Sequence, residues 1–309
     1  MSLALWLALA QTLFWAHGPQ TAPLLKQAGI ERLAVPPELN EAWQGQELEV
    51  EAVDAAKAEK LPAPGVEYQI NRASATKIPW VTAHGWRFLR SPEELFLYDA
   101  PGPGAALAAA EAFAYSGRAL VQTDEAGLEP LGRMLDFLRQ VEKPDLRAVA
   151  DVAVVDDDSS EVGEVLNLLS RSNLLYHTVE QPDANAKLNV ELGSPEYPRA
   201  QAAAPHELAA KVRENLTDDR RSLRIYGSQV VVGRLEGDGD RLRVHLLNYA
   251  GPRQIVPGLR VRVLGKYARQ RLTAEGVDSQ ELLDVRVEDD ATEFTVPEIQ
   301  VYAIVDLFR

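Results

Sequence analysis

The chain has no cysteine among its 309 residues. This absence excludes disulfide bonds, thiolate metal ligands and a cysteine nucleophile. Basic residues are also scarce, because 32 Lys and Arg stand against 46 Asp and Glu and give a formal net charge of −14. Such a surface repels phosphate backbones and anionic headgroups, so we expect neither a nucleic-acid partner nor a membrane partner.

Short motifs for cofactors and nucleophiles are missing as well. The sequence has no Walker loop, no zinc motif of His and Glu at helical spacing, and no Gly-x-Ser-x-Gly elbow. We therefore expect no cofactor and no bound metal. The one cation candidate is the acidic run at residues 156–158, for which N-capping of the following helix is the simpler interpretation.

The N-terminus has two interpretations. Residues 2–10 are apolar but too few to span a bilayer, which takes about 20 residues. Ala8-Leu9-Ala10 resembles a signal-peptide cleavage site, although no Lys or Arg precedes it. The stretch is thus either the remnant of an export signal or part of a buried first strand over residues 7–16. A chain without cysteine fits the cytosol as well as an exported compartment, so localisation stays open.

The first 145 residues alternate between short apolar runs and helical patterns, which predicts a mainly parallel sheet with helical cover. Strands are expected at 13–16, 31–35, 48–53, 66–70, 95–98 and 119–122, and helices at 21–28, 105–115 and 127–141, with a further short helix that ends at 42–45. Residues 71–91 interrupt the alternation with Trp80, His84 and Trp86 among Gly, Pro, Ser and Thr. We expect them to form a long loop.

Two further units follow. Residues 146–221 again read as α/β, with strands expected at 152–155, 174–179 and 188–192 and helices after 160 and over 205–216. Residues 222–309 alternate with a period of two, which is typical of an antiparallel sheet with one buried face. The polar side of this alternation carries Arg241, Arg243, His245, Arg260 and Arg262. It is a ligand face, a solvated face or a side that docks on a neighbouring domain.

Candidate site residues follow the strands of the first unit, because ligands meet parallel sheets at the carboxyl ends of the strands. A glycosidase needs one protonated and one ionised carboxyl flanking the scissile bond. Glu38, Asp99 and Asp124 are the candidate carboxyls. The candidate sugar contacts are Trp15, His17, Asn71, Arg72, Trp80 and Trp86, with the three tryptophans as stacking platforms.

Each candidate also has a structural interpretation. Glu38 follows two prolines and suits the first turn of a helix, where an acid meets the helix dipole. Asp99 precedes a Pro-Gly turn, and His17 suits a packed loop. Trp80 and Trp86 suit a core. Glu111, inside an Ala-rich helix, would be buried and would need a partner, for which a structural ion pair is the simpler explanation.

Three segments carry a resemblance. DVAVVDDDSSEVGEVLNLLSRSNLLYHTVE resembles the flavodoxin-type middle domain of some beta-galactosidases. AAAEAFAYSGRALVQ is similar to a late barrel helix and strand of such hydrolases, and LRVHLLNYAGPRQIVPGLRVRVL to their C-terminal β domain. The resemblance covers about a third of the chain. It implies a reduced (β/α) barrel at 1–145, a flavodoxin-like or amidotransferase-like α/β domain at 146–221, and an antiparallel β-sandwich-like domain at 222–309.

The departures from that pattern limit the function that follows. An amidotransferase needs a cysteine, and a full barrel takes about 250 residues. No catalytic motif of the hydrolases matches, so the carboxyls come from the rim argument alone. We expect a glycoside-hydrolase-like protein that acts on or binds carbohydrate through the strand tips. The alternative is a non-catalytic carbohydrate-binding or assembly protein on a degenerate scaffold. The middle domain of the resembling enzymes lies at oligomer contacts, which implies a homo-oligomer.

Overall fold

The structure is a computed structural model that describes residues 11–71, 76–203, 205–251, 253–277, 280–288 and 290–309. The chain splits into two compact units, Met1–Gly65 with Ser91–Lys143, and Val66–Arg90 with Pro144–Arg309. The expected division into three domains at residues 145 and 221 remains a prediction. Within the described part of the chain, no helix combines the length and the apolarity needed to cross a membrane. The expectations for residues 2–10 lie outside the described residues.

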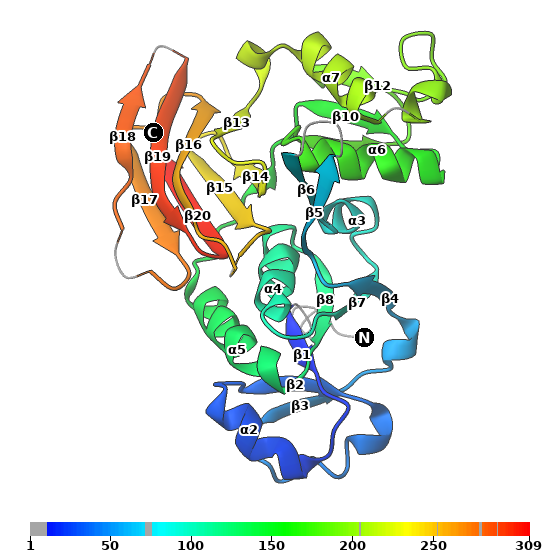
Figure 1. The fold of residues 1–309 in the computed structure, drawn as a ribbon, viewed down its shortest axis with the longest axis vertical. Coiled ribbons are helices and arrows are strands. Elements are labelled where there is room, and N and C mark those ends of the chain that lie inside the picture. Colours follow the sequence, from blue (N-terminus) through cyan, green and yellow to red (C-terminus); the bar gives the residue numbers. More distant parts are fainter. Residues whose placement is uncertain (1–10, 72–75, 204, 252, 278–279, 289) are drawn as a thin grey trace. The chain divides into compact units, whose positions relative to one another are not determined.

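A six-stranded parallel sheet forms the first unit and confirms the expected parallel arrangement (Figure 1). Its strands, in spatial order, are β3 (Glu49–Ala52), β2 (Arg32–Val35), β1 (Thr12–Phe14), β8 (Arg118–Gln122), β7 (Leu95–Asp99) and β4 (Glu59–Pro62). The first strand pairs with the last, a neighbourhood that a (β/α) barrel also creates. Backbone pairing among the described residues ends at β3 and at β4, so a reduced barrel remains a proposal.

Three helices accompany this sheet, namely α2 (Ala22–Gln27), α4 (Gly104–Ala114) and α5 (Glu125–Gln140). Helix α4 is buried along nearly its whole length because its alanines let the backbone approach its neighbours closely. The short helix expected to end at 42–45 is a 3-10 helix that already ends at Leu39. Turns follow this 3-10 helix, Pro37–Leu39, and in them the Trp43 amide donates to the Leu39 and Asn40 carbonyls. Two other 3-10 helices are Pro19–Thr21 and Ala55–Lys57.

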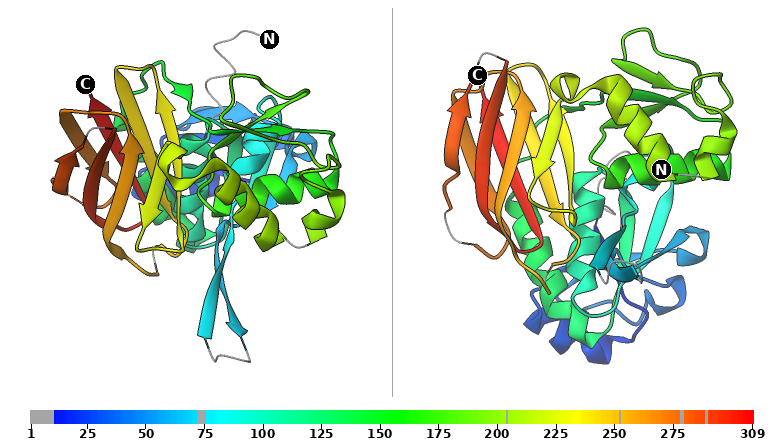
Figure 2. Two further views of the ribbon diagram at one scale, coloured as in Figure 1. Left: turned by 90° about the horizontal axis from the view of Figure 1, so that it is seen from above. Right: turned by 45° about the horizontal axis from the view of Figure 1, so that its top comes forward.

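The expected loop at residues 71–91 is wrong. Strands β5 (Gly65–Asn71) and β6 (Thr76–Thr82) pair as a two-stranded hairpin, and helix α3 (Gly85–Arg90) follows (Figure 2). Threonine, isoleucine and valine in residues 76–82 favour a strand, whereas Pro79 and the nearby glycines suggested a loop. Strand β5 pairs with β6 and not with the parallel sheet, so the strand expected at 66–70 exists but has a different partner.

The second unit also contains a three-stranded parallel sheet with helices α6 (Ser160–Arg171) and α7 (Pro205–Leu216). The strand order is β11 (Tyr176–Val179), β10 (Val152–Val155) and β12 (Leu188–Val190). This order, 2-1-3 along the chain, is the one with which flavodoxin-type sheets begin. The apolar face of α6, with Val162, Val165, Leu166 and Leu169, packs in the core beside β10 as its periodicity predicts.

Two antiparallel sheets complete the second unit and confirm the period-two prediction. One sheet has the order β13 (Leu223–Tyr226), β16 (Val256–Leu264), β19 (Ala291–Ile299), β18 (Leu283–Val287). The other has the order β17 (Arg269–Ala274), β20 (Tyr302–Phe308), β15 (Arg241–Asn248), β14 (Val231–Gly237), β9 (Arg147–Ala148). The alternate residues Leu242, Val244 and Leu246 enter one apolar core with Leu259, Val261 and Val263. The expected hairpin turn at 237–240 joins β14 to β15, with Gly239 at a φ of 101°.

The α/β part of the second unit is joined to the antiparallel part by the buried carboxylate of Asp151. Lys187 Nζ donates to Asp151 Oδ1 at 2.8 Å, and the Ser222 amide and hydroxyl donate to its two oxygens at 2.8 and 2.6 Å. A buried charge is tolerated only when it is paired and hydrogen-bonded. Asp151 meets that condition by contacting residues 36 and 71 positions away in the chain.

Replacing this carboxylate should destabilise the fold. We expect Asp151→Ala to lower the free energy of unfolding by about 1–3 kcal/mol, because it leaves the buried Ser222 amide without its acceptor and removes one of the acceptors of Lys187. Urea unfolding followed by circular dichroism measures the loss. Asp145→Ala, at an exposed aspartate, is the control and should change stability by less than about 0.5 kcal/mol. Equal stability of the two variants would contradict the assignment.

Candidate functional site

The carboxyl ends of the parallel strands bring Asp99 and Gln122 together. The two residues are direct partners across β7 and β8, and Gln122 is in turn the partner of Phe14 on β1. Both polar side chains are exposed. Since neighbouring strands lie about 4.8 Å apart, these two side chains form one polar edge of the sheet. Gln122 was not among the residues singled out from the sequence, because its exposure depends on where β8 ends.

Asp124 follows the same edge and caps helix α5. Its Oδ1 accepts hydrogen bonds from the Gly127 amide at 3.0 Å and from the Gly102 amide at 2.8 Å. The first bond starts the helix and the second holds the loop after β7, where Gly102 has a φ of 57°. Asp124 is therefore exposed yet structurally engaged, and it flanks the same loop as Asp99.

Glu38 lies exposed in the first turn of the 3-10 helix that follows β2, which confirms its structural interpretation. The side chain is placed after Pro36 and Pro37, where an acid meets the positive end of the turn. Its role as a catalytic carboxyl stays a prediction.

Trp15 and His17 both follow β1, but only His17 is exposed. The Trp15 indole is buried and donates to Thr21 Oγ1 at 2.8 Å. The His17 ring lies against it with 4.6 Å between ring centroids and 55° between ring planes. Trp43, which is also buried, donates its indole N–H to the His17 carbonyl at 3.1 Å. The two tryptophans thus hold His17 in place.

Trp80 and Trp86 belong to the second unit, and the faces expected to stack on sugars have protein partners. Trp86 is buried in the α/β core, which confirms the core interpretation for this residue, and the Arg87 guanidinium lies 4.4 Å from its ring centroid. The Arg171 guanidinium lies 4.0 Å from the Trp80 ring centroid. Arg72 and the Asn71 side chain lie outside the described residues.

The face of the sheet beneath the rim is apolar. Phe14, Ala34, Val53, Leu97 and Leu120 form one cluster there, and Ala55 and Ala58 from the segment between β3 and β4 pack against it.

Glu51 is a further carboxyl on this unit. Its pKa is raised, mainly because the side chain is partly buried. The positive charge of Arg32 opposes this rise and the negative charge of Glu49 adds to it. A carboxyl with a raised pKa suits a general acid. Strand register places Glu51 four strands from Asp99, through Ala34, Phe14 and Gln122. Four strand spacings amount to about 19 Å along the sheet, so Glu51 and Asp99 are not neighbours in the strand order.

The fully buried Glu111 has the partner that its burial requires. The Tyr98 hydroxyl, also buried, donates to Glu111 Oε2 at 2.7 Å. The bond links helix α4 to strand β7 and assigns the glutamate to the packing of the unit.

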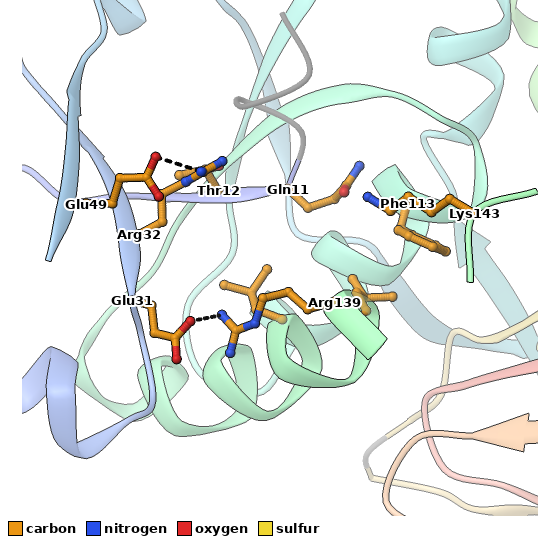
Figure 3. A pocket seen from close by; sticks show the side chains of 10 residues that line it. Gln11, Thr12, Glu31, Arg32, Glu49, Phe113, Arg139 and Lys143 are labelled. Carbon is orange, nitrogen blue, oxygen red and sulfur yellow. Dashed lines mark hydrogen bonds and ion pairs between the residues drawn. The ribbon is translucent and has the colours of Figure 1, made fainter. Parts of the chain in front are cut away.

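A cavity of about 340 Å³ lies at the opposite, amino ends of the strands. Its apolar floor includes Phe113, Leu135 and Leu138, and its rim carries charged side chains from β2, β3 and α5 (Figure 3). Ion pairs Arg32–Glu49 at 2.6 Å and Arg139–Glu31 at 3.3 Å cross this rim. Ligands of parallel α/β sheets bind at the carboxyl ends of the strands, which is the end opposite to this cavity.

The acidic run at residues 156–158 is used by the protein itself. Arg90 binds Asp156 through two hydrogen bonds of 2.8 and 2.7 Å, and Arg199 pairs with Asp157. Hydrogen bonds from Ser159 and Arg199 hold the pKa of Asp157 well below its usual range. Ser159 caps helix α6, which confirms the capping interpretation. Within the described ranges no three His, Cys, Asp or Glu side chains group as metal ligands would.

The arginine row of the antiparallel part is not a solvated face, because Arg243, His245 and Arg262 are buried. Arg243 binds Asp306 through bonds of 2.8 and 3.0 Å, and Arg241 and Arg271 reach the same carboxylate. The His245 ring lies between Tyr302 Oη at 2.6 Å and Glu236 Oε2 at 3.3 Å. Period-two alternation separates two faces but does not say which of them meets water, and that is why the sequence left this point open.

The buried histidine should make stability depend on pH. Burial lowers the pKa of His245 from 6.5. The positive charges of Arg234 and Arg243 lower it further, whereas the negative charge of Glu236 opposes the shift. Below a pH of 6.5 the unfolded chain binds the proton more readily than the folded one, so stability is lost as pH falls. The loss is up to about 1.4 kcal/mol per pH unit.

Urea unfolding at pH 7.5 and 5.5 tests this pH dependence. We expect the wild type to lose more stability on acidification than His245→Gln. His206→Gln, at an exposed histidine, is the control and should behave as the wild type. If His245→Gln retained the full pH dependence, the titrating group would be another one.

The cap formed by Asp124 should be measurable in the same way. Asp124→Ala removes the acceptor of two backbone amides, and we expect it to cost about 1–2 kcal/mol of stability. Asp124→Asn keeps a side-chain oxygen and should cost less than half as much. Thermal unfolding of both variants separates a structural cap from a purely chemical carboxyl, whose removal would leave stability unchanged.

Comparison with known proteins finds similarity at the level of the fold. No family model and no curated protein matches the chain. Among solved structures, the alpha-L-fucosidase isoenzyme 2 from Paenibacillus thiaminolyticus superposes with a TM-score of 0.53 at 11% identity, covering 70% of this chain and 60% of that chain. The fold is glycoside-hydrolase-like. The chain thus spans less than two thirds of the fucosidase, which is similar in fold alone.

Two weaker similarities accompany it. A rhamnosidase from Novosphingobium sp. PP1Y has a TM-score of 0.45 at 11% identity and covers 87% of this chain and 38% of that chain. A catalytic mutant of a GH42 beta-galactosidase from G. stearothermophilus has a TM-score of 0.33 at 8% identity and covers 96% of this chain and 60% of that chain.

Proposed function

We propose that this protein binds carbohydrate at the strand-tip rim of the first unit without hydrolysing it. The observation that carries the proposal is the position of Asp124, whose Oδ1 accepts from the Gly102 and Gly127 amides. These two bonds commit the Asp124 carboxylate to holding the start of helix α5 and the loop after β7, which is a structural use of the side chain. Asp99 is the other carboxyl at the ends of β7 and β8, and Glu51 lies four strands away from it.

The ligand class comes from the fold and from the chemistry of the rim. The structure that shares the fold is named an alpha-L-fucosidase, and a sugar presents hydroxyls that both donate and accept. Exposed groups at the rim include His17, Asp99 and Gln122, which together supply donors and acceptors. Because Trp15 is buried, recognition there rests on hydrogen bonds and not on aromatic stacking.

A second candidate function is hydrolysis by Asp99 and Asp124 as a carboxyl pair. It is favoured by one observation, that the two residues flank the same loop at the ends of adjacent strands β7 and β8. In this case Asp124 would serve as the ionised partner and Asp99 as the acid.

Sugar binding and sugar release separate the two functions. We expect a panel of neutral oligosaccharides to include a ligand whose Kd rises about tenfold, or 1.4 kcal/mol, in Asp99→Asn and in His17→Ala. Asp136→Asn, at an exposed carboxylate of α5, is the matched control and should bind as the wild type. Reducing-sugar release should stay at background in every protein. Release that disappears in Asp99→Asn would establish the hydrolase instead.

A further inference from the structure

The β5–β6 hairpin forms a groove with two loops of the antiparallel part of the second unit. The groove has a volume of about 330 Å³. Its lining includes Tyr68 and Pro79 from the hairpin, Ser228 and Gln229 before β14, and Gln254 and Ile255 before β16. This volume is at the small end of the range for small-molecule sites, about 300–1,000 Å³, and suits one or two sugar rings better than a folded partner.

The groove walls are held by hydrogen bonds before any ligand arrives. The Tyr68 hydroxyl donates to Gln254 Oε1 at 2.8 Å, which fixes the orientation of the ring. The side chain of the fully buried Asn248 donates to the backbone carbonyl of Gln254 at 2.7 Å. The backbone amide of Gln254 donates to the Ala250 carbonyl at 3.1 Å. At the base of the hairpin Val66 packs on the apolar core of the two sheets. Such preorganisation lowers the entropy lost on binding.

The lining is neutral and amphipathic. None of the ten described residues that line the groove carries a charge. Tyr68 and Ile255 are each 47% exposed, and both line the groove. The glutamines and the serine provide donors and acceptors within the same space. An ion would meet no countercharge, and a wholly apolar ligand would leave the amides unpaired.

We propose that this groove is a binding site for a neutral saccharide, with the Tyr68 ring against the C–H face of a sugar and the amides of Gln229 and Gln254 on its hydroxyls. A sugar ring has an apolar face and a polar edge, which match the two kinds of surface in the groove. The site belongs to the second unit alone and does not depend on the rim of the first unit.

Saturation-transfer NMR with lactose, maltose and cellobiose, each at about 10 mM, tests the site. We expect transfer to at least one of these sugars, and none to galacturonic acid or to an uncharged hexapeptide. Tyr68→Ala should reduce affinity at least tenfold, whereas Tyr68→Phe keeps the ring, loses the bond to Gln254 and should lose only a few-fold. Tyr226→Ala, at another exposed tyrosine of the second unit outside the groove, is the matched control.

Gln229→Ala alters the lining outside the hairpin and guards against an effect of Tyr68→Ala on the hairpin itself; it should weaken binding several-fold. Absence of transfer to all three sugars, unchanged affinity in both Tyr68→Ala and Gln229→Ala, or preference for the acid or the peptide would overturn the proposal. The rim variants Asp99→Asn and His17→Ala should leave this binding intact. Binding that is lost in the rim variants and kept in Tyr68→Ala would refute the groove site and support the rim.

Discussion

The ion pair between Arg90 and Asp156 decides where residues 66–90 belong. Two hydrogen bonds of 2.8 and 2.7 Å join the fork of the guanidinium to the carboxylate, and Arg90 also donates to the Ser159 carbonyl at 3.1 Å. Both side chains are largely buried, so breaking the pair would leave an uncompensated charge. Gly163 permits this approach, since a Cβ there would lie 3.0 Å from Arg90 Nη1.

Much of the functional arrangement follows from this one contact. With Arg90 held just before helix α6, Trp86 enters the α/β core and one face of Trp80 stacks against Arg171. The same contact takes Asp156 away from any cation. The other end of the segment carries Tyr68 to Gln254, where it forms one wall of the neutral groove. A segment that resembles an interruption of the first unit in sequence is thus a structural part of the second.

Elements with strong periodicity were predictable, and elements defined by their partners were not. The leucines of α5 and the alternation of Leu242, Val244 and Leu246 predict their structures because period and burial coincide there. Strand β4 was missed because Glu59 and Lys60 make it look polar, although it pairs with β7 along its whole length. Strand β6 was missed because Pro79 and its neighbours suggested a loop, and its partner β5 was placed in the wrong sheet for the same reason.

The candidate site was likewise predictable from the sequence only in part. The strand-tip rule located the ends of β1, β7 and β8 because it depends only on strand order, and parallel pairing brings Asp99 to Gln122 as that order requires. The rule cannot tell an available side chain from an engaged one. The Asp124 carboxylate accepts hydrogen bonds from two backbone amides, which lie 3 and 22 residues away in the chain. Only the nearer amide falls within the range that a local capping pattern in the sequence can indicate.

The charges of the protein determine which sugars the rim and the groove can bind. The chain carries a net charge of −14, and the rim adds exposed carboxylates at Glu38 and Asp99. Anionic sugars are therefore repelled by the whole field and by the rim itself, and the repulsion weakens with added salt. The groove has no charged lining residue, so a neutral sugar bound there meets little of this field. The affinity of the groove for a neutral sugar should then be almost independent of ionic strength. The discrimination of the rim against acidic sugars should become weaker as salt is added, because it arises from Coulomb repulsion that salt screens.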